Sequence, residues 1–463
     1  MRYWLETLGC PKNQVDSDKL GGRLESEGYE RATSPEGADL VVVNTCAFIE
    51  AARQESIDTI LELAQTSATG ARLAVTGCLA ERYGSELAAA LPEVDVVAGF
   101  GVSFTGPDPT APALQPTVAA LNPMAAALGI TAVAPDRTAG DAPAQMSPPA
   151  GVPVTLGRRP EPVPSFDLLN LPRPATTSPW GYVKVAEGCD RKCGFCAIPS
   201  FRGRQRSRRP DAILAEVDEL GAQEVVLVAQ DLASYGRDLG ERGIVDLVRS
   251  VAARVERVRL LYLYPSDLSD GLIDVIAETG CPYYDLSLQH VSRPHVRRMR
   301  RWGDGERFLT RIDRIRRLYP DAAFRSSFIV GYPGETEEDH DRLLEFVGAA
   351  ELDWAGFFPF SNEAGTYATT LGGQVDDALM AERLAEVSEL QDGITARRRR
   401  QLIGREVRVL VDRPGVGRSH REAPEIDGVV RLSGPAPAGT WLDVTVTGAE
   451  GPDLEARVLE GAA

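Results

Sequence analysis

The sequence contains no long hydrophobic run. None of the apolar stretches among its 463 residues approaches the length that a helix needs to cross a bilayer. Residues 1–8 also lack the long apolar core of a secretory signal peptide. These two absences predict a cytoplasmic protein that has no membrane partner.

Positive charge is in deficit as well. The chain has 50 Lys and Arg residues against 67 Asp and Glu residues, a formal net charge of −17. Because phosphate contacts dominate nucleic-acid affinity, such a chain is a poor general binder of nucleic acid and suits a basic protein partner better. Arginine-rich runs at 202–209, 297–301 and 397–400 are local exceptions. Each is either a solvated surface or a binding patch, and the first could hold a carboxylate or an acidic substrate.

Cysteine is scarce, but six of the seven cysteines fall into two triplets, which in a reducing compartment favours metal ligation over disulfides. Cys189, Cys193 and Cys196, the loop triplet, have the spacing C-x3-C-x2-C. Three thiolates can hold three corners of a cubane iron–sulfur cluster and leave one iron open, and an open metal position usually serves chemistry. No fourth Cys or His follows at zinc-finger spacing, which disfavours a structural zinc site. Phe195 would supply an apolar wall beside the cluster.

Cys10, Cys46 and Cys78 form the N-terminal triplet, and each directly follows a predicted strand. In an open α/β sheet the carboxyl ends of the strands lie at one edge, where ligands bind. We therefore expect these thiols to gather there and to hold a second cluster. Three unrelated buried thiols are the alternative.

The predicted fold class is α/β with a smaller β-barrel at the C-terminal end. Strands and helices alternate over 1–101, which indicates a parallel sheet covered by helices. Residues 102–178 are rich in Ala, Pro, Gly and Thr and are expected to be a linker with one short helix at 121–128. Six strand–helix units over 179–400 predict a partial (β/α)6 barrel, with its site at the C-terminal strand ends. Residues 401–463 predict a small antiparallel barrel.

The expected elements follow from apolar runs and from helical periodicity. The predicted helices of the N-terminal part are 16–27 and 50–65. The predicted strands are 3–8, 38–45, 71–77, 94–99, 181–185, 224–228, 257–262, 284–288, 323–330, 354–360, 406–412, 428–432, 441–446 and 454–458.

The loop triplet resembles that of the radical S-adenosylmethionine enzymes. Apart from the linker, the whole chain resembles the methylthiotransferases of that class, which carry an N-terminal cluster domain and a C-terminal TRAM barrel. The runs 286–290 and 331–339 are similar to motifs shared across the family, whereas 100–180 matches no usual connection of its first two domains.

Two further runs, 7–17 and 423–428, resemble the branch that modifies small-subunit ribosomal protein twelve. Acidic residues outnumber basic ones in 401–463, which also favours this branch, because a barrel that grips tRNA would be expected to be basic. The alternatives are a tRNA adenosine (isopentenyl or threonylcarbamoyl) methylthiotransferase and a non-catalytic iron–sulfur scaffold.

The resemblance implies the cofactors and the reaction. The loop triplet would hold a 4Fe–4S cluster that binds S-adenosylmethionine, and the N-terminal triplet would hold an auxiliary 4Fe–4S cluster that carries sulfur. One S-adenosylmethionine would methylate that sulfur. A second would be cleaved to a radical that takes hydrogen from the β-carbon of an aspartate, so that the product is 3-methylthioaspartate. An electron donor such as a flavodoxin or ferredoxin is also implied.

Several other residues are candidates for the site. By resemblance, the turn made by Gly331, Tyr332, Gly334 and Glu335 lines the S-adenosylmethionine site, where glycine allows close backbone approach, or it is an ordinary strand-to-helix turn. Three further residues have either a ligand-contacting or a structural role. Gln230 and Asp231 could touch ribose or substrate, and His290 could shuttle a proton. Cys281 is expected to be a buried structural thiol.

Overall fold

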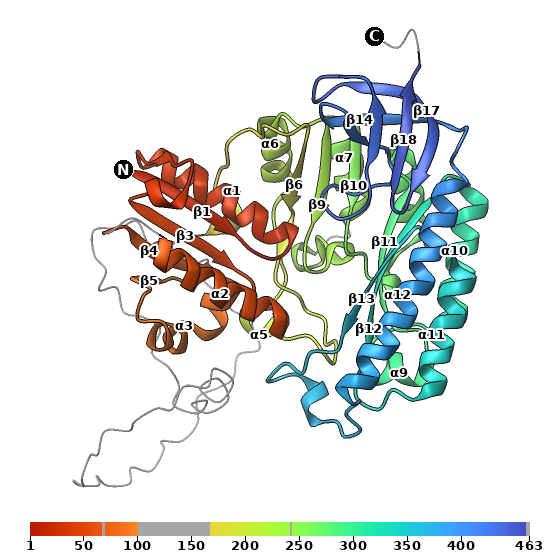
Figure 1. Cartoon of the computed structure of the whole chain (residues 1–463), viewed down its shortest axis with the longest axis horizontal. Coiled ribbons are helices and arrows are strands. Elements are labelled where there is room, and N and C mark those ends of the chain that lie inside the picture. Colours follow the sequence, from red (N-terminus) through yellow and green to blue (C-terminus); the bar gives the residue numbers. More distant parts are fainter. Residues whose placement is uncertain (67–69, 101–166, 241–242, 460–463) are drawn as a thin grey trace.

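The computed structural model describes residues 1–66, 70–100, 167–240 and 243–459. Figure 1 shows an N-terminal α/β part, a middle part of strands and surrounding helices, and a small β-barrel at the C-terminal end. Most of the predicted linker, including the expected helix at 121–128, lies outside the described residues. The end of the predicted linker contains a short 3-10 helix, η2 (Leu168–Asn170), and Leu168 packs into the core of the N-terminal part.

The N-terminal part is built on a parallel sheet with the strand order β2-β1-β3-β4-β5. Its predicted strands and helices are confirmed apart from their ends, and β2 and α3 were missed. Val41, Val42 and Val43 in the central strand are completely buried because helices cover both faces of the sheet. The elements are β1 (Arg2–Thr7), α1 (Pro11–Ser26), β2 (Glu30–Arg31), β3 (Leu40–Thr45), α2 (Glu50–Thr66), β4 (Arg72–Gly77), α3 (Cys78–Ala90) and β5 (Val96–Val97).

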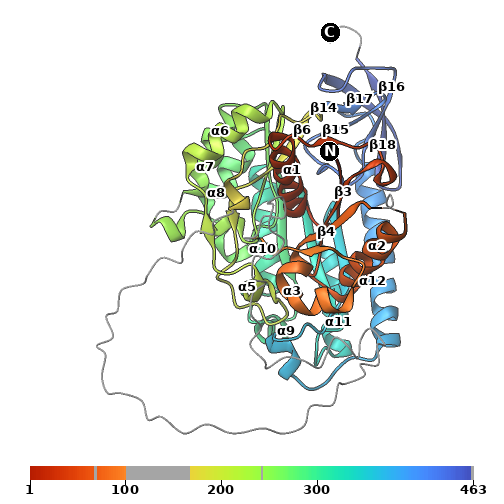
Figure 2. The ribbon, with the colours of Figure 1, turned by 90° about the vertical axis from the view of Figure 1, so that its left-hand side faces the viewer.

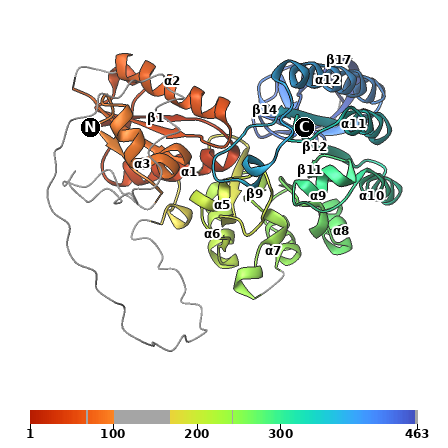
Figure 3. The same ribbon diagram turned by 90° about the horizontal axis from the view of Figure 1, so that it is seen from below.

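The middle part is the predicted partial barrel of six parallel strands. Two sheets, β10-β9-β6 and β11-β12-β13, are joined by a parallel bridge between Leu263 and Leu286. Seen from below, the helices lie around the outside of the strands (Figure 3). The strands are β6 (Trp180–Lys184), β9 (Glu224–Val228), β10 (Arg257–Leu260), β11 (Tyr283–Gln289), β12 (Ala323–Val330) and β13 (Trp354–Pro359). The main outer helices are α6 (Pro210–Leu220), α7 (Ile244–Ala252), α8 (Asp270–Glu278), α10 (Gly305–Leu318), α11 (Glu337–Ala350) and α12 (Asp377–Arg400).

The C-terminal part is a closed barrel with the strand order β14-β15-β16-β18-β17. The expectation that it is wholly antiparallel is wrong, because β16 and β18 pair in parallel. A closed ring with an odd number of strands cannot alternate direction throughout, so one parallel pair is unavoidable. The strands are β14 (Glu406–Arg413), β15 (Val416–Arg418), β16 (Val430–Ser433), β17 (Trp441–Glu450) and β18 (Asp453–Val458). Among the helices of the described residues, none has the length and hydropathy of a membrane-spanning segment.

The run 423–428 connects this barrel to the interior of the middle part. Ala423 belongs to a buried cluster that also contains Val15 of α1 and Trp354 of β13. Tyr182 donates a hydrogen bond to the carbonyl of Pro424 at 3.0 Å. The motif that pointed to one family branch therefore packs the three parts of the chain together.

Asp427 in this run makes stability depend on pH. Burial, opposed by Arg325 at 3.5 Å and by a hydrogen bond from Tyr283 at 2.6 Å, raises the pKa of Asp427 to about 6. Because its pKa is higher in the folded protein than in the unfolded chain, the Asp427 carboxyl stabilises the fold when it is protonated. This stabilisation is fully present below the ordinary pKa of an aspartate and is lost as the pH rises through about 6.

We expect the unfolding free energy to fall by about 1 kcal/mol between pH 5 and pH 7 through this group. Anaerobic denaturant unfolding of the parent and of Asp427→Asn at both pH values measures the difference. Asp443→Asn, which changes an exposed carboxylate on β17, is the control and should keep the parent dependence. An equal pH dependence in Asp427→Asn and in the parent would contradict the prediction.

Candidate functional site

The N-terminal triplet gathers at the carboxyl edge of its sheet, where it was expected. Cys10 precedes α1 directly, Cys46 follows β3, and Cys78 is the first residue of α3. The approach is close enough to require glycine beside the first thiol. Gly9 has a φ of +95°, and a Cβ there would lie 2.8 Å from the Cβ of Cys46.

Burial raises the pKa of two of these thiols, Cys46 and Cys78, and nearby cations oppose it. Burial, and then the neighbouring Cys78, raises the pKa of Cys46 to about 12. For Cys10 burial acts in the same direction, but Lys12 and Arg202 outweigh it and lower the pKa. Arg202 also donates a hydrogen bond to the Cys78 sulfur at 2.9 Å. A metal-bound cysteine is a thiolate, so this positive surrounding suits a cluster.

The loop triplet follows β6 and the short β7 (Ala186–Glu187) at the C-terminal strand ends of the middle barrel. Burial is the largest effect on two of its thiols and raises the pKa of Cys189 to about 11 and that of Cys196 to about 12. Arg301 donates to the sulfur of Cys193 at 3.2 Å. The backbone N–H of Arg191 donates to the sulfur of Cys189 at 3.4 Å. Donors to sulfur are thus present at this triplet too.

The turn after β12 lies beside the loop triplet. Phe195 packs against a buried cluster that contains Tyr332, and a Cβ at Gly194 would lie 2.6 Å from the Tyr332 hydroxyl. Gly331, with a φ of +81°, and Gly334, with a φ of +83°, open the turn. The structure therefore brings the predicted S-adenosylmethionine turn and the loop triplet together.

Glu335 has a structural role within this turn. Its Oε2 accepts a hydrogen bond from the backbone N–H of Gly331 at 2.7 Å, and its Oε1 accepts one from Arg383 at 3.2 Å. Both carboxylate oxygens are therefore engaged inside the protein. Glu335 closes the turn.

His290 is completely buried, which favours the structural interpretation over a proton shuttle. Its Nδ1 accepts a hydrogen bond from the backbone N–H of Ser292 at 3.2 Å, so the ring proton is on Nε2. Burial, and then His295, lowers the pKa of His290 well below its ordinary value. Within the described residues Nε2 has no hydrogen-bond partner, and Glu335 lies 3.9 Å away. The imidazole therefore stays neutral at physiological pH.

Gln230 and Asp231 both contact the elements that carry the loop triplet. Gln230 donates to Glu187 at 2.7 Å, and Asp231 accepts from Arg191 at 2.6 Å. These contacts favour the structural interpretation of both residues. Cys281 is buried as expected, with its sulfur 3.8 Å from the carbonyl oxygen of His420.

A buried ionic network between the two triplets was missed in the sequence. Lys184 of β6 forms ion pairs with Asp16 of α1 and with Glu187, the second at 2.6 Å. Arg202 donates to Glu187 at 2.8 Å and to Asn13 at 2.9 Å. The signal was present in two noted runs, since Asn13 and Asp16 lie in 7–17 and Arg202 begins the first arginine-rich run. Figure 2 shows α5 (Ile198–Phe201), the helix just before Arg202, next to α3.

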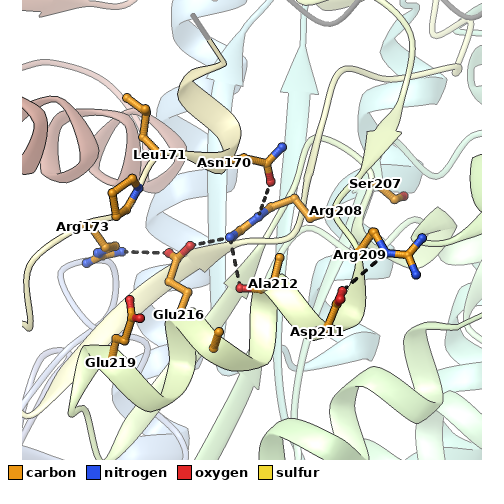
Figure 4. A pocket seen from close by; sticks show the side chains of 12 residues that line it. Asn170, Leu171, Arg173, Ser207, Arg208, Arg209, Asp211, Ala212, Glu216 and Glu219 are labelled. Carbon is orange, nitrogen blue, oxygen red and sulfur yellow. Dashed lines mark hydrogen bonds and ion pairs between the residues drawn. The ribbon is translucent and has the colours of Figure 1, made fainter.

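The arginine-rich runs 202–209 and 397–400 largely form ion pairs within the described part of the chain. Arg206 binds Asp167 at 2.7 Å, Arg398 binds Asp353 at 3.0 Å, and Arg208 binds Glu216 at 2.7 Å. A cavity of about 500 Å³ lies beside α6, and Figure 4 shows Glu216 between Arg208 and Arg173 in its wall. None of the predicted site residues lines this cavity.

Three family models match the chain part by part. Residues 2–99 match the uncharacterized protein family UPF0004, residues 183–347 match the radical SAM superfamily, and residues 403–459 match the TRAM domain. The middle part is thus that of a radical S-adenosylmethionine enzyme.

Full-length relatives identify the family. Ribosomal protein uS12 methylthiotransferase RimO of Streptomyces coelicolor is 42% identical over 99% of this chain and 96% of its own length. RimO of Streptomyces avermitilis is 43% identical over the same shares of the two chains. The chain belongs to the family of ribosomal protein uS12 methylthiotransferases. Among solved structures, the radical S-adenosylmethionine methyltransferase TsrM of Kitasatospora setae is 16% identical, with a TM-score of 0.44 over 77% of this chain and 74% of that chain.

Proposed function

We propose that this chain attaches a methylthio group to the β-carbon of an aspartate in ribosomal protein uS12. The observation that carries the proposal is the pair of cysteine triplets, held on two domains and joined by the buried contacts of Arg202. Membership of the uS12 methylthiotransferase family supports the same substrate. It disfavours the tRNA adenosine alternative and the non-catalytic scaffold.

We propose 4Fe–4S clusters for both triplets, and the residues present fit them. Each triplet offers three thiols, and an arginine donates a hydrogen bond to one sulfur of each: Arg202 to Cys78 and Arg301 to Cys193. When bound, the clusters and S-adenosylmethionine would supply the electron transfer, the radical chemistry and the sulfur. The protein would hold three corners of each cluster.

The turn after β12 is proposed to line the S-adenosylmethionine site. Gly331 and Gly334 would let the backbone approach the cofactor, while Tyr332 and Phe195 would form an apolar wall that excludes water. Glu335 would act by closing this turn. Gln230 and His290 would act as supports of the loop triplet and of the turn, without contact to the reacting atoms.

The remaining partners stay predictions. The acidic excess of the C-terminal barrel suits a basic ribosomal protein, and tRNA is not expected to bind. A flavodoxin or ferredoxin is proposed as the electron donor, and the cytoplasm as the location.

Anaerobic reconstitution tests the proposed reaction. Protein loaded with iron and sulfide receives S-adenosylmethionine and a reductant, together with both uS12 and tRNA, and mass spectrometry follows both substrates. We expect a methylthio group on one aspartate of uS12, and none on uS12 in which that aspartate is replaced by asparagine. Methylthio adenosine in the tRNA would instead move this chain to the tRNA branch.

A further inference from the structure

Arg202 extends from one cysteine triplet to the other. It follows α5 directly, six residues after Cys196, the last cysteine of the loop triplet. Its Nη2 donates to the sulfur of Cys78 and to Asn13 Oδ1, both at 2.9 Å. A side chain that belongs to the radical S-adenosylmethionine part therefore places its charge on a sulfur of the N-terminal triplet.

The guanidinium is fixed in this position. Its Nη1 donates to Glu187 at 2.8 Å and lies 3.6 Å from Asp16, and its face lies 4.4 Å from the ring centre of Phe100. Only 3% of the side chain is exposed, so water does not compete for the sulfur. Lys184 binds the same two carboxylates and neutralises part of their charge.

We propose that Arg202 is a positioning residue that raises the reduction potential of the cluster held by the N-terminal triplet. The inference rests on the proposed assignment of that triplet as cluster ligands. One-electron reduction adds a negative charge to a cluster, and hydrogen bonds to its sulfurs help to set its potential. A cationic donor at 2.9 Å stabilises the reduced form more than the oxidised form.

Arg301 is the counterpart at the loop triplet and supplies a matched control. It donates to Cys193 at 3.2 Å, and its guanidinium lies 4.3 Å from the ring centre of Tyr264. Its hydrogen bond to the Ser287 carbonyl is on the middle barrel, outside the N-terminal part. Changing Arg301 should therefore alter only the other cluster.

The test is a potentiometric titration followed by electron paramagnetic resonance. Full-length protein with all three loop-triplet cysteines replaced by alanine isolates the N-terminal cluster, and dithionite supplies the electron. We expect Arg202→Gln to weaken reduction of this cluster at least tenfold, which for one electron is a shift of about 59 mV to more negative potential. Arg202→Lys keeps the positive charge but loses the planar guanidinium, and it should shift the potential less than Arg202→Gln does. Arg301→Gln in the same background should not shift it.

A charge-balanced variant distinguishes a change in the reduction potential of the cluster from damage to the fold. Arg202→Gln combined with Glu187→Gln removes one charge of each sign, and iron per chain is measured for every variant. An unchanged potential in Arg202→Gln that keeps its iron overturns the inference, as does an equal shift from Arg301→Gln. Loss of the cluster from all Arg202 variants would also overturn it and leave a purely structural residue. Absence of iron from the triple-alanine parent itself would instead overturn the ligand assignment.

Discussion

Replacing Cys189, Cys193 and Cys196 together by alanine is expected to abolish both S-adenosylmethionine cleavage and methylthio transfer, and to leave about half of the iron. The loop triplet lies at the C-terminal strand ends of the middle barrel and is proposed to hold the cluster that binds S-adenosylmethionine. The N-terminal triplet lies on its own sheet and should retain its iron. Iron analysis and chromatography of 5′-deoxyadenosine measure the two effects separately.

The reciprocal replacement should separate the steps of the reaction. With Cys10, Cys46 and Cys78 changed to alanine, we expect S-adenosylmethionine cleavage to continue while methylthio transfer to uS12 is lost. Cys281→Ala is the matched control, since this buried thiol lies outside both triplets and should keep full iron content and activity. Complete loss of iron after changing either triplet alone would contradict two independent clusters.

The gathering of the thiols could be predicted because it depends on topology alone. Each N-terminal thiol follows a strand of the sheet, and parallel strands end at the same edge of a sheet. The run of Val41, Val42 and Val43 indicated the central strand, because a strand that is covered on both faces of its sheet is apolar throughout. Local patterns thus sufficed for the sheet and for the two candidate metal sites.

The contacts between the parts could not be predicted, because they join residues far apart in the chain. Lys184 binds Asp16 across 168 positions, and Arg202 reaches Cys78 across 124. No spacing rule relates such residues. Arg202 belongs to a run that was interpreted as a surface or as a site for an external carboxylate, yet its partners are Glu187 and Asp16 of this chain. Short elements were missed because they contain too few residues to show a strand pattern; β15, for example, spans only Val416–Arg418.

Glu224 illustrates how much such contacts matter. It begins a strand that the sequence predicted, but its buried carboxylate lies at the centre of three arginines. Arg259 lies 2.8 Å away, Arg418 of the C-terminal barrel 3.0 Å, and Arg257 3.5 Å. Burial opposes ionisation, but Arg418, Arg259 and Arg257 outweigh it and lower the pKa of Glu224 to about 2. Its stabilisation is therefore present above the ordinary pKa and is lost as the pH falls toward 2.

Glu224→Gln is expected to destabilise the protein by about 3 to 5 kcal/mol, because it leaves buried arginines without their counter-charge. The shift in pKa, converted at about 1.4 kcal/mol per unit, gives about 3 kcal/mol, which agrees with that range. Anaerobic denaturant unfolding measures the loss. Glu219→Gln, an exposed change on α6, should cost less than about 0.5 kcal/mol. Among the described residues Arg259 pairs with no carboxylate other than Glu224. Adding Arg259→Met to Glu224→Gln therefore removes an unpaired charge and should restore part of the stability, whereas additive losses would show that the carboxylate and Arg259 are not coupled.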